Sequence, residues 1–302
     1  MGIVKAVCTS EKKGTVKKDI GECLVIEDFG LSGDAHAGSE RQVSLLSYES
    51  TERFKETMPF SDIIVPGVFG ENLLVEGYDL KTYPTGTRFR CGEVLLELTQ
   101  IGKSCHTGCE IRKLAGDCIM PREGVFAKVI KGGMIHTGDE IQRVFRASVI
   151  TVSDRSYQGV REDKSGEVLS DILEQYGYQV AERLLLPDEE DDIYKALTEA
   201  ADVKDVDIVF TTGGTGFAGR DRTPEATLKA GERNAPGIAE ALRARSLLIT
   251  PNAMYSRAAS VIRKNTLIIN LPGSPKAVRE CLEYLLPKLT HGIAILRGEA
   301  DG

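Results

Sequence analysis

The chain has 302 residues, of which 41% are hydrophobic and 27% charged, and it contains no tryptophan. This length predicts about two domains, each large enough to bury a core of its own. The net charge is −7 and neither half carries a basic surplus, which argues against a protein that binds the phosphate backbone of a nucleic acid.

Hydropathy and cysteine content indicate the cellular compartment in which the protein is expected. No stretch of about 18 apolar residues occurs, and the first residues lack the long apolar segment of a signal peptide. We therefore expect a cytoplasmic protein that does not contact membranes. Seven cysteines, an odd number, then indicate free thiols or a reactive site instead of a disulfide framework.

Residues 1–145 are predicted to form an all-β domain. Short segments rich in Val, Ile, Leu and Thr alternate with glycines throughout this half. Residues 38–46 and 91–99 are each predicted to form one strand, and residues 48–57 the one clear helix. Many short strands with few helices are typical of a β-barrel or β-sandwich.

Four short motifs occur in the first half, in the order 33–38 (GDAHAG, with Arg41 downstream), 67–73 (GVFGENL), 100–105 (QIGKSC) and 133–139 (GMIHTGD). Together they resemble the MOSC domain, which is found at the C-terminus of molybdenum cofactor sulfurases and as free-standing bacterial proteins. The resemblance implies a β-barrel that binds or sulfurates the molybdenum cofactor, with one cysteine as the active thiol.

The MOSC motif places that thiol at Cys105, although the family pattern has a proline where this chain has Ser104. His36 and Arg41 are predicted to contact the anionic phosphate of the pterin, because arginine can grip phosphate through two hydrogen bonds. Two alternatives remain open. Zinc could be held by a set of soft ligands, namely Cys105, His106, Cys109 and Cys118. Cys109 and Cys118 could equally be small buried apolar residues.

Residues 146–302 are predicted to form an α/β domain in which strands and helices alternate. The predicted strands are 148–152, 180–186, 208–210 and 266–271. The predicted helices are 165–176, 189–201, one beginning at Thr223, one at Pro236, and a last one from Pro275 to about His291. This alternation predicts a doubly wound, mostly parallel sheet, which binds ligands at the carboxyl ends of its strands.

Two loops of this half are predicted to bind anions. Residues 212–216 (TGGTG) follow a strand and precede a helix with Thr223 as its N-cap. Residues 272–275 (PGSP) repeat the arrangement, with Ser274 as the N-cap. Backbone amides at such helix starts point at an anion.

Carboxylates follow the strands at the same edge, at Asp154, Asp188 and Asp221. Carboxylates beside phosphate-binding loops favour a magnesium–nucleotide site, because Mg²⁺ prefers oxygen ligands and shares them with phosphates. The structural alternatives are a helix N-cap for Asp188 and a turn for Asp221.

The ordered set of segments 152–155, 187–189, 212–216, 220–226, 256–257 and 270–276 closely resembles the molybdopterin adenylyltransferases, including the G domains of plant and animal molybdenum cofactor proteins. The resemblance implies transfer of AMP from ATP to the terminal phosphate of molybdopterin with release of pyrophosphate, without pyridoxal phosphate. It makes Asp188 and Asp221 the catalytic carboxylates, acting through Mg²⁺. The implied nucleotide- and molybdopterin-binding residues are Ser153, Asp154, Thr212, Gly213, Gly214, Thr215, Gly216, Glu225, Ser256, Arg257, Asn270, Pro272, Gly273 and Ser274.

The resemblance also implies a homo-oligomer, a trimer in this family, and contacts with other cofactor-biosynthesis proteins or apo-molybdoenzymes. The alternative function is a non-catalytic carrier or scaffold that binds molybdopterin or the finished cofactor. Which of the two loops holds the nucleotide and which the pterin stays open.

Overall fold

The computed structural model describes residues 2–57, 61–104 and 117–299. The chain divides into two compact units, Met1–Val144 and Phe145–Gly302. Cys105, His106 and Cys109 lie outside the described residues, so the active thiol and the zinc alternative stay predictions. Cys118 is described and is buried in an apolar cluster of the first unit, 5% exposed.

The first unit is a closed β-barrel, as the sequence predicted. Its ring runs β1 (Gly2–Thr9), β11 (Glu140–Val144), β7 (Arg88–Cys91), β8 (Val94–Ile101), β9 (Val125–Lys131), β5 (Val43–Ser47) and β6 (Leu73–Glu76), which pairs again with β1. β2 (Lys18–Asp19) extends β1, and β3 (Glu22–Ile26), β4 (Gly30–Leu31) and β10 (Gly133–His136) form a small second sheet. The short helices are α1 (Tyr48–Glu56), η1 (Ser61–Ile63), η2 (Leu80–Thr82) and α3 (Met120–Glu123).

Two predicted strands of this unit begin later than expected. The first, predicted from Gly38, begins only at Val43, because Gly38 has a φ of 73° and donates its N–H to the carbonyl of Phe29 in a tight turn. The second, predicted from Cys91, begins at Val94, because Gly92 has a φ of 55° in the turn between β7 and β8. In both places glycine takes a left-handed conformation that other residues rarely adopt.

The acidic residues of two predicted motifs are buried and stabilise loops of the barrel. Asp34 forms a buried ion pair with Lys17 and accepts the N–H groups of Ser10 and His36, each at 3.0 Å. Glu71 is fully buried, and its carboxylate accepts the N–H of Gly67 at 2.6 Å. These carboxylates therefore hold the chain in place from inside the unit.

The second unit is built on one mixed sheet. Its strand order is β13 (Gln179–Leu186), β12 (Arg146–Val152), β14 (Ile208–Thr212), β17 (Thr266–Leu271), β16 (Ser260–Arg263) and β15 (Arg233–Asn234). The first four strands are parallel, and β16 runs antiparallel to β17. The predicted mostly parallel sheet is confirmed.

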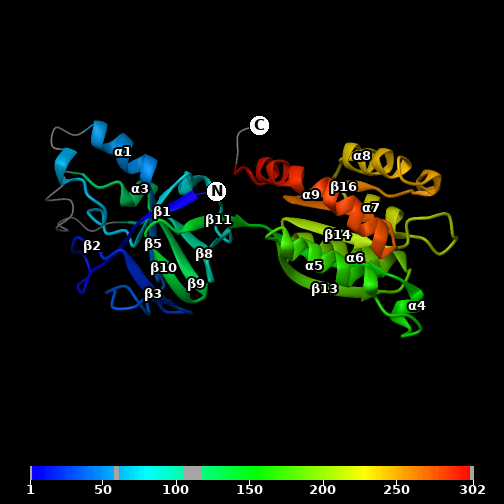
Figure 1. Ribbon diagram of the computed structural model, residues 1–302, viewed down its shortest axis with the longest axis horizontal. Coiled ribbons are helices and arrows are strands. Elements are labelled where there is room, and N and C mark those ends of the chain that lie inside the picture. The colour runs from blue at the N-terminus through cyan, green and yellow to red at the C-terminus, as the bar shows by residue number, and fades with distance from the viewer. Residues whose placement is uncertain (1, 58–60, 105–116, 300–302) are drawn as a thin grey trace. The chain divides into compact units, whose positions relative to one another are not determined.

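Helices cover both faces of this sheet (Figure 1). One face packs against α5 (Lys164–Gln175), α8 (Pro236–Leu247) and α9 (Pro275–Arg297), and the other against α6 (Glu190–Asp202) and α7 (Thr223–Ala230). α9 runs past the predicted end at His291, because Ile293 is still buried in the core, and it ends at Gly298, which has a φ of 71°. Among the helices of the described residues, none is both long and apolar enough to cross a membrane.

Candidate active site at the carboxyl edge of the second sheet

Asp154 and Asp188 tie together the ends of two neighbouring parallel strands. Asp154 follows β12 and Asp188 follows β13. The N–H of Asp154 donates to Oδ2 of Asp188 at 2.8 Å, and the N–H of Asp188 donates to Oδ1 of Asp154 at 3.0 Å. Glu189, not Asp188, is the N-cap of α6, so the helix-cap alternative for Asp188 is wrong.

The glycine loop after β14 lies close to the carboxylate of Asp188. Gly213 and Gly214 have φ angles of 100° and 62°, conformations that favour glycine. A Cβ atom on Gly214 would lie 2.9 Å from Oδ1 of Asp188, which shows how closely the backbone approaches the carboxylate. No acceptor within the described residues takes the N–H groups of Gly214, Thr215 and Gly216. They are therefore available to an anion.

Asp221 closes the other side of the loop. Its Oδ2 accepts the N–H of Ala218 at 3.0 Å, and a Cβ atom on Gly216 would lie 2.9 Å from the same oxygen. The carboxylate therefore belongs to a turn and also faces the glycine loop. The turn predicted for Asp221 is confirmed, and its catalytic role stays a prediction.

Thr223 has a different role from the predicted helix cap. The N-cap of α7 is Arg222, which makes no side-chain capping hydrogen bond, and Thr223 is the first residue of the helix. The hydroxyl of Thr223 instead donates to the carbonyl of Gly213 at 2.9 Å, and its N–H donates to Gly214 at 3.2 Å. The glycine loop folds back over the start of α7, and these two hydrogen bonds from Thr223 hold it there.

Arg220 is a site residue that the sequence reasoning did not single out. Its guanidinium donates to both carboxylate oxygens of Asp154, each at 3.0 Å, and to Glu189 at 2.8 Å. The side chain is 58% exposed. Its position immediately before Asp221 could have pointed to it, because an arginine beside a predicted catalytic carboxylate lies near the same edge of the sheet.

The second predicted loop packs against the first. A Cβ atom on Gly273 would lie 3.2 Å from the Cα of Gly213, and the hydroxyl of Thr212 donates to the carbonyl of Pro272 at 2.8 Å. Ser274 is the N-cap of α9, and its hydroxyl accepts the N–H of Ala277 at 3.2 Å. Ser153 caps α4 (Asp154–Tyr157) in the same way. All these residues lie at one edge of the sheet.

Two further predicted binding residues, Asn270 and Arg257, make hydrogen bonds at or beside the glycine loop. Asn270 is 1% exposed, and its amide donates to the hydroxyls of Thr211 and Thr227 at 2.9 and 2.8 Å. Arg257 forms an ion pair with Glu225 and donates from Nε to the carbonyl of Gly216 at 2.6 Å. The structure thus brings together the predicted residues, while their roles toward a ligand stay predictions.

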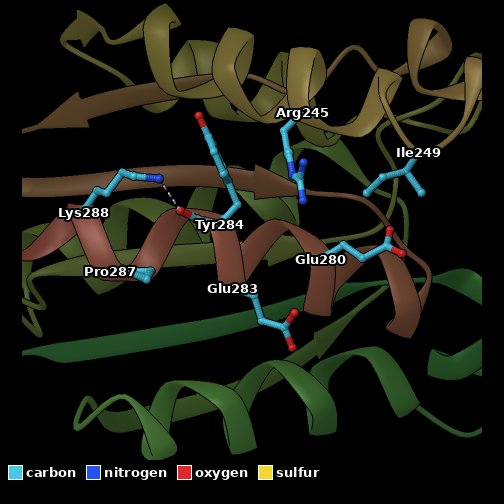
Figure 2. A pocket seen from close by; sticks show the side chains of 7 residues that line it. All are labelled: Arg245, Ile249, Glu280, Glu283, Tyr284, Pro287 and Lys288. Atoms are coloured by element: carbon cyan, nitrogen blue, oxygen red, sulfur yellow. Dashed lines mark hydrogen bonds between the residues drawn. The ribbon is translucent and has the colours of Figure 1, made fainter.

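A pocket of about 270 Å³ opens beside the glycine loop. Thr215 and Gly216 form one wall, and Ser256, Asn270 and Pro272 contribute to the lining, together with apolar residues of α8 and η3 (Pro251–Tyr255). A separate hollow of about 290 Å³ lies along α8 and α9 (Figure 2). Its lining consists of Arg245, Ile249, Glu280, Glu283, Tyr284, Pro287 and Lys288 and includes no residue of the glycine loop. We therefore place the candidate site at the pocket of about 270 Å³ beside the glycine loop.

The carboxylates of the edge influence one another electrostatically. Burial raises the pKa of Asp188, and the charges of Asp154 and Asp221 raise it further. The hydrogen bonds from Arg220 lower the pKa of Asp154, and the N–H of Asp188 adds to this effect. Burial and these neighbouring charges therefore make the ionisation of Asp188 costly, and a cation bound there would favour its ionised form.

The donor set suits a magnesium ion that is shared with a substrate. Oδ1 of Asp188 and Oδ1 of Asp221 accept no hydrogen bond from the described residues. In the part of the chain that the structure describes, no group of three or more His, Cys, Asp or Glu side chains could hold a metal ion. One or two carboxylates completed by phosphate oxygens are the usual arrangement for Mg²⁺, so the residues fit that ion.

In the first unit, Arg41 lies beside the strand that leads to Cys105. Its Nε donates to the side chain of Gln100 at 3.0 Å, and its guanidinium lies 5.1 Å from the ring centre of Phe126. Lys103 lies over the same ring at 5.7 Å. His36 is 3.5 Å from Asp34, measured from Nδ1 to Oδ1. Two of the predicted motifs therefore meet through Arg41 and Gln100.

Comparison with known proteins separates the same two halves. The family model of the probable molybdopterin binding domain matches residues 148–291. A molybdopterin adenylyltransferase from Helicobacter pylori is 43% identical over 152 residues, which are 50% of this chain and 86% of that protein. The molybdopterin adenylyltransferase of Escherichia coli K12 is 43% identical over 46% of this chain and 72% of its own length.

This chain belongs to the molybdopterin adenylyltransferase family. A second family model, the MOSC domain, matches residues 32–142, so the family's α/β domain follows a MOSC domain in one chain. Both resemblances found in the sequence are thereby confirmed. Among solved structures, the molybdopterin biosynthesis enzyme MoaB from Thermus thermophilus is 44% identical, covering 51% of this chain and 97% of that chain, with a TM-score of 0.49.

Proposed function

We propose that the second unit transfers AMP from ATP to the terminal phosphate of molybdopterin and releases pyrophosphate, a step of molybdenum cofactor biosynthesis. One observation carries this proposal: the glycine loop, with amides available to an anion, lies in direct contact with the carboxylate of Asp188 and closes against Asp221. Family membership supports it, because the relatives from H. pylori and E. coli bear the name of this activity.

The reaction is a displacement at phosphorus. An oxygen of the pterin phosphate attacks the α-phosphorus of ATP, and the bond from that phosphorus to the bridging oxygen of the β-phosphate breaks. The electron pair leaves with pyrophosphate, and the product contains a new phosphate–phosphate linkage to AMP. The step needs no covalent nucleophile on the protein, since positioning and charge neutralisation account for most phosphoryl-transfer catalysis.

Different residues at the carboxyl edge of the sheet would bind the phosphates and hold the metal ion. The amides of Gly214, Thr215 and Gly216 bind phosphate oxygens, and the start of α9 at Ser274 offers a second anion site. Asp188 and Asp221 would hold Mg²⁺, which neutralises charge on the phosphates when bound. The pocket of about 270 Å³ beside the loop receives a ring of one of the two substrates.

The experiment is to incubate the full chain with ATP, Mg²⁺ and molybdopterin and to quantify products. Adenylyl transfer predicts one pyrophosphate for each adenylylated molybdopterin formed. The alternative, a carrier without catalysis, predicts molybdopterin binding with no pyrophosphate release. Binding without turnover would therefore overturn the proposal.

For the first unit we propose that it binds the molybdenum cofactor, with Arg41 and His36 at the phosphate and Cys105 as the reactive thiol. The placement of Arg41 beside Gln100 and next to Lys103, on the strand that leads to Cys105, supports this assignment. Cys105→Ala tests the thiol. Loss of sulfur loading of the cofactor would assign sulfur transfer to Cys105, and unchanged loading would exclude it.

A further inference from the structure

Arg257 connects three segments of the candidate active site. It lies between η3 and β16, and its backbone N–H donates to the carbonyl of Thr215 at 2.9 Å. From the guanidinium, Nε donates to the carbonyl of Gly216 at 2.6 Å and one terminal nitrogen to the carbonyl of Asp221 at 2.7 Å. The other terminal nitrogen pairs with the carboxylate of Glu225 on α7.

These contacts occupy every nitrogen of the guanidinium. Nε and both terminal nitrogens each donate to one protein acceptor, so these contacts use three of the five N–H donors of the guanidinium. A planar guanidinium can satisfy such a set at once, whereas the ammonium of lysine is a point charge on a flexible stem. The side chain of Arg257 is 33% exposed, so this charge is already compensated within the protein and only partly open to solvent.

The glycine loop depends on such an external anchor. Gly213 and Gly214 have positive φ angles, and glycine has the widest backbone freedom of any residue. In the proposed reaction the loop must nevertheless present its amides to a phosphate, while the nearby Asp221 carboxylate would act on the phosphates through Mg²⁺. Arg257 grips Gly216 within the loop and the peptide carbonyl of Asp221 itself, so a single side chain sets the distance between them.

We infer that Arg257 is a positioning residue: it holds the glycine loop and Asp221 in register for the transfer step and does not bind substrate phosphate itself. This inference rests on the proposed adenylyl transfer. It replaces the nucleotide- or molybdopterin-binding role that the resemblance implied for Arg257 with an action through the loop.

A matched control lies at the opposite edge of the sheet. Arg263, on β16, forms a similar set of hydrogen bonds, with two to the carboxylate of Asp202 and one to the carbonyl of Ala230 at 3.0 Å. It pairs in register with Thr266, the first residue of β17, and so lies away from the carboxyl ends of the parallel strands. Arg263→Gln removes an arginine of the same kind without touching the loop.

The experiment compares full chains carrying Arg257→Lys, Arg257→Gln or Arg263→Gln. Two quantities are measured: kcat and KM for Mg·ATP, and hydrogen exchange of the backbone amides of residues 213–221. Because small misplacements of reacting groups can cost about 100-fold in rate, we expect both Arg257 variants to lose about 100-fold in kcat. We expect KM to change little, exchange in 213–221 to accelerate in both, and Arg263→Gln to match the wild type.

The lysine variant separates positioning from direct binding. If Arg257 contacted phosphate through its charge, lysine would restore much of the activity, and glutamine would chiefly raise KM. That result, or unchanged exchange in 213–221, would overturn the inference. Should Arg257→Gln fail to fold, Glu225→Gln weakens the same anchor and is expected to show intermediate exchange and kcat. A wild-type chain that forms no adenylylated product contradicts the proposed function instead, and the exchange measurement still tests the anchor.

Discussion

Asp154 and Asp188 each accept the backbone N–H of the other, at 3.0 and 2.8 Å. This reciprocal pair joins the loops after β12 and β13 and brings two carboxylates together at the edge of the sheet. Only the charge of Asp154 is compensated directly, by the two hydrogen bonds from Arg220. Asp188 is therefore left as the carboxyl with the raised pKa, and a cation bound beside it would favour its ionised form.

Removing Arg220 is expected to change the pH dependence of the reaction. Burial and the charges of Asp154 and Asp221 raise the pKa of Asp188, while Arg220 lowers it. Arg220→Gln removes the lowering effect, so the pKa rises further and ionised Asp188 is reached only at higher pH. The acid limb of kcat/KM should thus shift to higher pH. Arg279→Gln, an exposed change on α9, should leave the limb in place, and a shift of the Arg220→Gln limb to lower pH would refute this electrostatic account.

Gly214→Ala should disable the glycine loop. Its φ is 62°, and the added Cβ would lie 2.4 Å from the hydroxyl of Thr223 and 2.9 Å from Oδ1 of Asp188. The loop must then move away from the carboxylate, and we expect kcat to fall by about 100-fold. Gly219→Ala is the matched control, because its Cβ would meet nothing within 4 Å. Equal activity of the two variants, measured as pyrophosphate release, would show that the close approach is not needed.

Removing one partner of the buried pair of Lys17 and Asp34 should destabilise the barrel. Lys17→Met leaves the carboxylate of Asp34 buried beside an apolar side chain, and breaking a buried ion pair in this way costs about 3–5 kcal/mol. Adding Asp34→Asn removes the uncompensated charge, so the double variant should recover part of the loss. Chemical denaturation of the full chain measures both effects. A double variant as unstable as the sum of the single variants would argue against coupling.

Glu71 should make the barrel less stable as pH rises. Burial raises the pKa of this carboxyl to about 7 from an ordinary value of 4.5. A raised folded-state pKa means that the stability contributed by the protonated form is full below the ordinary value and is lost as pH rises through about 7. We expect the barrel to melt at a lower temperature at pH 8 than at pH 6. Glu71→Gln should reduce that difference, whereas Glu40→Gln, at an exposed position, should preserve it.

The location of the second-unit site could be predicted from the sequence. Strands that are followed by Asp154, by Asp188, by the glycine loop and by Pro272 specify one edge, because parallel strands bring their carboxyl ends together. The sequence pattern likewise predicted the four parallel strands and the five long helices of this unit, whereas the short strands β15 and β16 were not predicted. Helix and strand patterns, glycine loops and N-caps each depend on residues close together in the sequence. Such features can therefore be recognised before the fold is known.

The partners of individual side chains could not be predicted in this way. Arg220 contacts Asp154 across 66 positions of sequence, and Arg257 contacts Gly216 across 41. Thr223 looked like a helix cap, but the return of the loop offers its hydroxyl the carbonyl of Gly213 instead. The late start of β5 depends on a turn in which Gly38 bonds to Phe29. In each case a tertiary contact determines the hydrogen-bond partner or the start of the element, and the local sequence does not indicate that contact.

The most direct test of the account compares wild type with Asp221→Ala in the adenylylation assay with ATP, Mg²⁺ and molybdopterin. Asp221 faces the glycine loop and offers an oxygen for the metal, so its loss should abolish pyrophosphate release while the chain stays folded. The account predicts product from the wild type and none above background from Asp221→Ala. Equal turnover by both proteins, or by neither, would contradict it.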